Sequence, residues 1–300
     1  MTFHLLHRLS SLALLWIFSS IKVVGESREG MNSSNNNWRD KVKGGNKYHP
    51  SSSTPIKKSG SILFWFKATG FGFFFDSTLE TVDHCSPFRP DITFVVGLLG
   101  RYQSNPKPDH WVVVKKVLRY LKGTSDIKLV YHKVQNLKLV GYTDSDFIGC
   151  GDDRKSTLGY IFRFADGAIL WKSVKQTLIT SSTMHAEFVA LFRVSTHAVL
   201  LKNFISELKV VDFIAGHIRL YCDNIFLVMF SINNKSITRS KHVEIKFLTF
   251  KELVKNGDIL VEHLEIDDML ADPLTKELRP NVFQKYVINM GLKELFDVLD

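Results

Sequence analysis

The sequence contains too little cysteine for a structure built on disulfides or on thiolate-bound zinc. Three cysteines in 300 residues are few and odd in number, which excludes a disulfide scaffold. No Cys-x-x-Cys pair occurs, which excludes a zinc ribbon and a thioredoxin-like redox site. With 45% hydrophobic and 23% charged residues, the chain is neither fully disordered, nor collagen-like, nor a multi-span membrane protein. Its length allows one large domain or two ordinary ones.

Long apolar runs are also missing. Residues 1–25 have the pattern of a secretory leader, with Arg8 ahead of an apolar run that ends near Ile21. That run is too short to cross a bilayer, so we expect no stable membrane span. Any apolar N-terminus can imitate such a leader, and the alternative of a secreted protein rests on this stretch alone. Residues 26–84 combine a low-complexity linker with a phenylalanine-rich segment, and we expect them to be disordered.

The net charge of +9 is unevenly distributed along the chain. Most of the excess positive charge lies in residues 1–60, whereas the rest of the chain is close to neutral. Lys and Arg side chains on a folded domain attract the phosphates of nucleic acids. The charge of the main body therefore permits a nucleic-acid partner but does not require one.

Residues 85–132 have the pattern of a short helical unit. An apolar stretch over 92–99 is followed by a proline-containing turn, and apolar residues then recur at three- and four-residue spacing over 111–121. Gly123 is expected to end the second helix. The pattern predicts helix, turn and helix, ending before a new unit that begins near residue 137.

Residues 137–292 have the pattern of an α/β domain. Ala165-Asp166-Gly167 is a hairpin-turn signal between two β-rich runs. The predicted strands cover 137–147, 160–164, 168–171, 218–222 and 258–265, and the predicted helices cover 182–208, a stretch from 224, 239–255 up to Gly257, and a stretch from about Pro273. Three antiparallel strands followed by α/β crossovers predict a mixed sheet flanked by helices.

Four acidic residues stand at the ends of these predicted elements. They are Asp144, Glu187, Asp223 and Asp272. Clustered carboxylates repel one another, and hard divalent cations such as Mg²⁺ or Mn²⁺ remove that penalty through oxygen ligands. Two such ions, roughly 3.5–4 Å apart, activate a water and stabilise the departing oxygen of a phosphodiester. The four residues therefore indicate metal-assisted hydrolysis.

Each of these acids also has an ordinary structural explanation. Asp272 before Pro273 is a suitable helix N-cap, and Glu187 suits the positive end of its helix. Asp223 fits turn chemistry after a strand, and Asp146 on the same strand face competes with Asp144 for the proposed role. Spacing alone leaves these alternatives open.

Several stretches carry a resemblance that covers about residues 85 to 292. The stretches are RPDITFVVGLLGRYQSNP, HWVVVKKVLRYLKGTSD, GYTDSDFIGC, DDRKSTLGYIF, GAILWKSVKQTLITSSTMHAEFVAL, YCDN, SKHVEIKF and ADPLTK. In this order they closely resemble the C-terminal end of the Pol polyprotein of copia-type LTR retrotransposons. The resemblance implies a ribonuclease H-like domain over 137–292 and the tail of a reverse transcriptase over 85–132. It also implies a cytoplasmic or nuclear location, unless the leader is genuine.

The family resemblance implies both an activity and a set of ligands. The activity is endonucleolytic cleavage of the RNA strand of an RNA–DNA hybrid. Two divalent cations, Mg²⁺ or Mn²⁺, would be held by Asp144, Glu187, Asp223 and Asp272. No small-molecule cofactor is expected, and a reverse transcriptase supplied in trans is a further expected partner. The chain lacks the Tyr-x-Asp-Asp polymerase motif, so no polymerase activity is expected.

His185 departs from the family pattern. It stands where such elements usually carry a glutamate, and a cation beside Glu187 would weaken a divalent site. This favours the alternative that the chain is a catalytically inactive, truncated retroelement remnant with at most weak nucleic-acid binding.

Five further residues are predicted to contact substrate. They are Ser145, Arg154, Lys155, Ser156 and Asn224. A basic, hydroxyl-bearing turn suits a phosphate backbone, and an amide beside Asp223 suits a sugar hydroxyl. A solvated turn explains the basic residues equally well.

Overall fold

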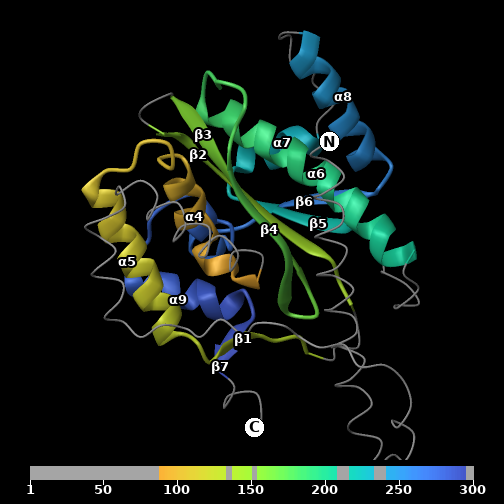
Figure 1. Ribbon diagram of the computed structural model, residues 1–300. Coiled ribbons are helices and arrows are strands. Elements are labelled where there is room, and N and C mark those ends of the chain that lie inside the picture. Colours follow the sequence, from red (N-terminus) through yellow and green to blue (C-terminus); the bar gives the residue numbers. More distant parts are fainter. Residues whose placement is uncertain (1–87, 133–136, 151–153, 208–215, 233–240, 295–300) are drawn as a thin grey trace, which may run out of the picture.

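The computed structural model describes residues 88–132, 137–150, 154–207, 216–232 and 241–294 (Figure 1). The predicted leader over 1–25 and the predicted disorder over 26–84 lie outside these ranges. The described part is organised around one five-stranded sheet with the strand order β4-β3-β2-β5-β6. These strands are β2 (Val140–Cys150), β3 (Lys155–Phe164), β4 (Gly167–Lys175), β5 (Ile218–Cys222) and β6 (Ile259–His263).

The sheet is mixed, as the sequence pattern predicts. Strand β3 pairs antiparallel with both β2 and β4, whereas β5 runs parallel to both β2 and β6. Ala165 and Asp166 both adopt positive φ angles, of 52° and 63°, at the turn between β3 and β4. Two consecutive positive φ angles suit the right-handed twist of a hairpin, which explains why the Ala-Asp-Gly signal locates this turn.

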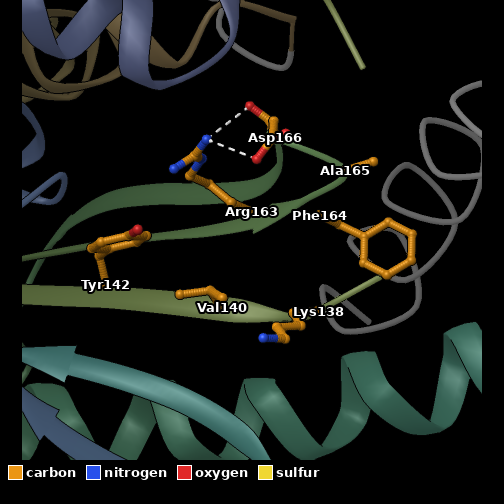
Figure 2. A pocket seen from close by; sticks show the side chains of 7 residues that line it. All are labelled: Lys138, Val140, Tyr142, Arg163, Phe164, Ala165 and Asp166. Atoms are coloured by element: carbon orange, nitrogen blue, oxygen red, sulfur yellow. Dashed lines mark hydrogen bonds and ion pairs between the residues drawn. The ribbon is translucent and has the colours of Figure 1, made fainter. Parts of the chain in front are cut away.

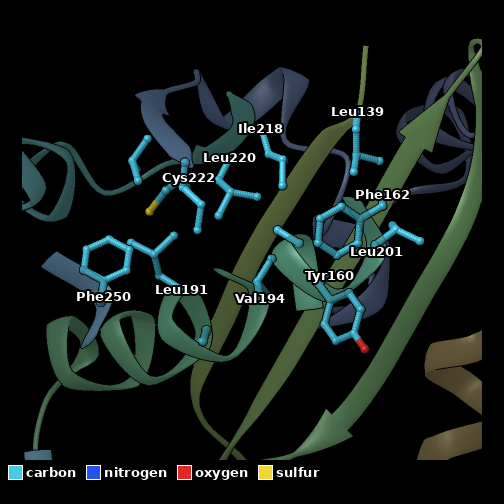
Figure 3. Close-up of a cluster of buried hydrophobic side chains, with 14 of the residues drawn as sticks. Leu139, Tyr160, Phe162, Leu191, Val194, Leu201, Ile218, Leu220, Cys222 and Phe250 are labelled. Atoms are coloured by element: carbon cyan, nitrogen blue, oxygen red, sulfur yellow. The ribbon is translucent and has the colours of Figure 1, made fainter. Parts of the chain in front are cut away.

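Three helices cover one face of the sheet: α6 (Thr183–Glu207), α7 (Ile225–Ile232) and α8 (Lys241–Lys255). In Figure 3, Leu191, Val194 and Leu201 of α6 face Phe162 and Leu220 of the sheet, within one buried cluster. Among the described residues, α6 is the helix long and apolar enough to suit a membrane span. Its burial against the sheet accounts for both properties.

The other face of the sheet is covered by elements from both ends of the described chain. These are η2 (Pro90–Ile92), α4 (Thr93–Gly100), η4 (Asp272–Leu274) and α9 (Pro280–Asn289), while α5 (Pro108–Gly123) packs against α4 and η3 (Ile266–Asp268) precedes η4. Ile161 of β3 packs there with Leu274 and Tyr286, while its neighbours Tyr160 and Phe162 point into the α6 cluster. Strand β3 is therefore buried on both faces.

Two features of the C-terminal part differ from the sequence prediction. The helix predicted from about Pro273 is only the 3₁₀ turn η4, and the α-helix begins at Pro280. A small second sheet, β1 (Ile127–Leu129) with β7 (Leu292–Glu294), was not predicted because three residues are too few to show an alternating pattern. The predicted fold class, a ribonuclease H-like mixed sheet flanked by helices and preceded by a helical segment, is confirmed.

Candidate metal centre

Asp144 and Asp223 are brought together by parallel strand pairing. Tyr142 of β2 lies opposite Tyr221 of β5 in register, and each acid follows its tyrosine by two residues. Asp144 is only 3% exposed and Asp223 is half-buried just beyond the end of β5. Two residues distant in sequence therefore share one end of the sheet.

Glu187 reaches the same place from just after the first turn of α6 and is 4% exposed. Gln176 ties this turn to β2, because its amide donates hydrogen bonds to the Ser145 hydroxyl and to the Ala186 carbonyl, both at 3.0 Å. Ser182 caps the helix by accepting a hydrogen bond from the backbone N–H of His185 at 3.2 Å. The position of Glu187 is thus fixed by its neighbours.

Asp272 approaches Asp144 from the opposite face of the sheet. Lys276 joins the two, with its Nζ 3.0 Å from Asp272 Oδ2 and 3.7 Å from Asp144 Oδ2. The Thr275 hydroxyl donates a hydrogen bond to Asp144 Oδ2. Gly159 lies opposite Asp144 in register, and a Cβ there would lie 2.6 Å from Thr275 Cγ2. Glycine at this position therefore lets η4 sit directly on β3.

The pKa values of the acids show that they share one electrostatic environment. Burial, and next the charges of Asp144 and Asp223, raise the pKa of Glu187 to about 9. Burial and the Asp144 charge raise the pKa of Asp272 to about 7, although Lys276 opposes the shift. The same two causes raise the pKa of Asp223. The cluster carries more negative charge than its surroundings compensate.

Lys276 offsets part of that charge. Burial lowers the pKa of its ammonium, but Asp144 and Asp272 outweigh this effect, so the pKa is raised. Sequence reasoning did not assign a role to Lys276, Thr275 or Gln176. The first two belong to the Ala-Asp-Pro-Leu-Thr-Lys stretch, but their contact with Asp144 depends on tertiary packing that no local pattern encodes.

The residues present fit a hard divalent cation. Glu187 Oε2 and Asp272 Oδ1 are buried and have no hydrogen-bond partner. One ligand-capable atom from each of Glu187, Cys222 and Asp223 lies within 4.8 Å of the others. Burial raises the pKa of the Cys222 thiol, which keeps it protonated and a weak ligand. The donors that remain are carboxylate oxygens, which suit Mg²⁺ or Mn²⁺.

The structure also bears on the alternative roles of the acids. Asp272 is the first residue of the 3₁₀ turn η4 and Ala271 occupies its N-cap position, so Asp272 is not the N-cap of a helix here. Asp146 is half-buried, and burial followed by the Asp144 charge raises its pKa. Its carboxylate lies against Gly149, whereas Asp144 makes the contacts with Thr275 and Lys276. Of the two aspartates on this strand face, Asp144 is the one joined to Asp272.

The predicted substrate residues occupy different environments. Arg154 is exposed and Lys155 is partly exposed at the start of β3. Ser145 and Ser156 are buried, and the Ser156 hydroxyl lies 3.0 Å from the Thr180 hydroxyl. Asn224 Oδ1 accepts hydrogen bonds from the backbone N–H groups of residues 226 and 227 and caps α7. Contact of these residues with a substrate stays a prediction.

A separate pocket of about 210 Å³ lies at the beginning of β2, beside the β3–β4 hairpin (Figure 2). Arg163 closes one side of it by donating a hydrogen bond to the Asp166 carbonyl at 3.1 Å and pairing with the Asp166 carboxylate at 3.6 Å. The lining residues include none of the four acids. The acid cluster, and not this pocket, is therefore the candidate site.

Comparison with known proteins places the chain in a family. No family model matches it. The chain is 35% identical over 196 residues to the retrovirus-related Pol polyprotein from transposon TNT 1-94 of Nicotiana tabacum, covering 65% of this chain. It is 33% identical over 204 residues, 68% of the chain, to that from transposon RE2 of Arabidopsis thaliana. The chain belongs to the family of copia-type retrotransposon Pol polyproteins.

The copia-type chain spans only 14% of the length of either relative. It is also 40% identical over 113 residues to secreted RxLR effector protein 161 of Plasmopara viticola, covering 38% of this chain and 80% of that protein. Among solved structures it resembles LC11-RNase H1 isolated from compost, at 18% identity and a TM-score of 0.35, covering 50% of this chain and 98% of the other. The strand order and directions described above carry the fold assignment.

Proposed function

We propose that the chain is a metal-dependent ribonuclease H-like enzyme that cleaves the RNA strand of RNA–DNA hybrids endonucleolytically. The observation that carries the proposal is the pair of buried, unpartnered carboxylate oxygens, Glu187 Oε2 and Asp272 Oδ1, within a cluster of four acids. β2, α6 and η4 supply three of these acids, and Asp223 directly follows β5, so four separate parts of the chain contribute to the cluster. Structures of LC11-RNase H1 and of a foamy viral protease–reverse transcriptase in complex with RNA/DNA hybrids support this class of substrate.

In this proposal Asp144, Glu187, Asp223 and Asp272 hold two Mg²⁺ or Mn²⁺ ions. Bound divalent cations lower the pKa of a coordinated water and stabilise the departing oxygen of a phosphodiester. Asp144 is central, because its charge raises the pKa of each of the other three acids.

The chain's own residues hold the ligands in place and receive the substrate. Gln176 fixes the first turn of α6 on β2, and Thr275 fixes one oxygen of Asp144. Arg154 and Lys155 lie at the surface, where they would contact phosphates. Asn224 follows Asp223, and its amide would reach a sugar 2′-hydroxyl, which distinguishes RNA from DNA.

We further propose that 137–292 is the catalytic domain and 85–132 the tail of a reverse transcriptase. Helix α4 contacts both β4 and η4, and Arg101 at its end donates a hydrogen bond to the Thr157 hydroxyl at 3.2 Å. The helical segment would thus support the sheet beside the site. A polymerase acting with this domain would be supplied in trans.

One observation favours a second candidate, a hybrid-binding remnant without catalysis. Lys276 places a positive charge on two proposed ligands, Asp144 and Asp272. A permanently bound ammonium at that position would exclude one of the two cations. His185 is less informative, since its Nδ1 lies 3.4 Å from the Ser181 backbone N–H, and the charges that shift the pKa of Glu187 come from other residues.

A hybrid-cleavage assay in Mg²⁺ tests the proposed function, comparing the unaltered chain with Asp223→Asn. Because this change removes a ligand charge but keeps the side-chain shape, cleavage should fall by about 100-fold or more. Asp109→Asn on α5 is the matched control, since Asp109 is exposed and outside the cluster. Equal activity in the chain and in Asp223→Asn would overturn the assignment, and no activity in either would favour the remnant.

A further inference from the structure

Lys276 divides the acid cluster into two unequal halves. Its ammonium lies 3.0 Å from Asp272 Oδ2 and 3.7 Å from Asp144 Oδ2, and its side chain is 37% exposed. The Asp144–Asp272 half thus already contains a cation that the protein itself supplies. A divalent ion coordinated by the same oxygens, at about 2.0–2.1 Å, would lie close to a like charge.

In the other half of the cluster, Lys276 forms no ion pair with Glu187 or Asp223 among the described residues, although its charge lowers the pKa of both, as that of His263 lowers the pKa of Asp223. Glu187 Oε2 is buried without a hydrogen-bond partner, and atoms of Glu187 and Asp223 lie within 4.8 Å of each other. The charges of Asp144 and Asp223 both act on Glu187. This half therefore offers several oxygens, and the pKa values of Glu187 and Asp223 stay raised despite Lys276, so an incoming ion meets negative charge that is only partly compensated.

We propose that Lys276 competes with a divalent cation for the Asp144–Asp272 position. Without substrate, the chain then binds one divalent ion readily on the Glu187–Asp223 side and a second ion only weakly. The inference rests on the proposed role of the four acids as metal ligands. It assigns to Lys276 a regulatory role that the proposed function does not require.

Movement of Lys276 would couple the second ion to the nucleic acid. The lysine side chain is a flexible four-carbon stem that ends in a compact charge, and this one is partly exposed. A phosphate of a bound hybrid offers the ammonium another anionic partner. Transfer of Lys276 to that phosphate frees Asp144 and Asp272, so hybrid and second ion must strengthen each other's binding by the same factor.

The test is calorimetric titration of Mn²⁺ into the metal-free full-length chain, without nucleic acid. The unaltered chain should show one tight site, whereas Lys276→Gln should show two, with the second at least about tenfold tighter than in the unaltered chain. Lys276→Arg keeps the charge and should resemble the unaltered chain. Lys276→Met keeps the length of the stem without the charge, and it serves if the glutamine variant does not fold.

Lys285→Gln is the matched control, because Lys285 Nζ also lies 3.0 Å from an aspartate, Asp268 Oδ1, outside the acid cluster. It should bind Mn²⁺ as the unaltered chain does. Two tight ions in the unaltered chain, or no gain in either charge-removing variant, would overturn the competition.

Hybrid cleavage in the same preparations separates the two proposals. If the chain cleaves hybrid but its Mn²⁺ isotherm does not respond to loss of the Lys276 charge, the proposed function stands and the competition by Lys276 is wrong. If the chain neither binds Mn²⁺ nor cleaves hybrid, both the proposed function and the competition by Lys276 are wrong.

Discussion

At the scale of single residues, Glu187 lies in an environment that disfavours its ionised form. Burial and neighbouring acids raise its pKa from 4.5 to about 9. When the folded state raises the pKa of a carboxyl group, the unfolding free energy of the protein falls as the pH rises from the pKa in the unfolded chain to the pKa in the folded chain. Over that range the group releases its proton in the unfolded chain but keeps it in the folded one. Without a metal ion, the charges at the proposed cation position therefore reduce the unfolding free energy of the protein at neutral and higher pH.

Glu187→Gln should reveal that cost as a function of pH. Each unit of pKa shift corresponds to about 1.4 kcal/mol, so at pH 8 the metal-free variant should exceed the unaltered chain in unfolding free energy by an amount on the order of a few kcal/mol. Near pH 4.5 the difference should be small. Urea unfolding in a chelating buffer between pH 5 and 9 measures it, and a difference that does not change with pH would contradict the pKa assignment.

Residue-level patterns in the sequence located the four acids but not the group that joins them. Asp144, Glu187, Asp223 and Asp272 stand at the ends of the elements predicted from the sequence, and the family resemblance, more than their spacing, favours them as ligands. Lys276 and Gln176 act through contacts that bridge distant parts of the chain. Such contacts follow from packing and leave no periodic signal.

At the scale of elements, the position of η4 on β3 decides whether Asp272 can meet Asp144. Gly159 provides the space, since a Cβ there would lie 2.6 Å from Thr275 Cγ2, 2.8 Å from Leu274 Cβ and 3.1 Å from the Ala271 carbonyl oxygen. Two of these three atoms belong to side chains packed on the sheet and the third to backbone, so η4 would have to shift.

Gly159→Ala should therefore separate the two halves of the cluster. The variant should lose about 1–3 kcal/mol of unfolding free energy through overpacking. When combined with Lys276→Gln, in which the second ion is expected to bind tightly, it should also weaken Mn²⁺ binding on the Asp272 side, which calorimetry measures. Gly100→Ala is a suitable control because a Cβ at that helical position meets no atom within 4 Å. Unchanged metal binding when Gly159→Ala is added to Lys276→Gln would show that η4 need not sit where it does.

The elements that the sequence predicted well are those with long, regular patterns. β5 has the predicted bounds, and α6 and α8 differ from theirs by a residue or two. The prediction of a helix from Pro273 was wrong. A proline after an acid satisfies the rule for a helix start, but the structure has only one 3₁₀ turn there, packed against β3. Local rules identify a start signal but not how far the element continues.

At the scale of the whole molecule, the segment just before the five-stranded sheet pairs with the C-terminal end of the described chain. β1 pairs with β7, and the Val130 backbone N–H donates to the Gly291 carbonyl at 2.8 Å. The Tyr131 hydroxyl donates to the Ala168 carbonyl at 2.7 Å. The segment before residue 137 is thus part of the support of the sheet.

A chain that begins at residue 137 should consequently be less stable than one that begins at residue 85. Loss of the Tyr131 packing and of these hydrogen bonds should lower the unfolding free energy by an amount on the order of 2 kcal/mol or more. Urea unfolding of the two chains side by side measures the difference. Equal stability would show that 137–292 folds without the preceding helices.

The central claim is that folding gathers four distant acids into one cation site. Anomalous X-ray scattering from crystals grown with Mn²⁺ tests it most directly. A strong peak is expected within coordination distance of Asp144, Glu187 and Asp223, with a weaker or absent second peak beside Asp272 while Lys276 is in place. Manganese bound elsewhere, with the four carboxylates left without an ion at millimolar concentration, would contradict the claim.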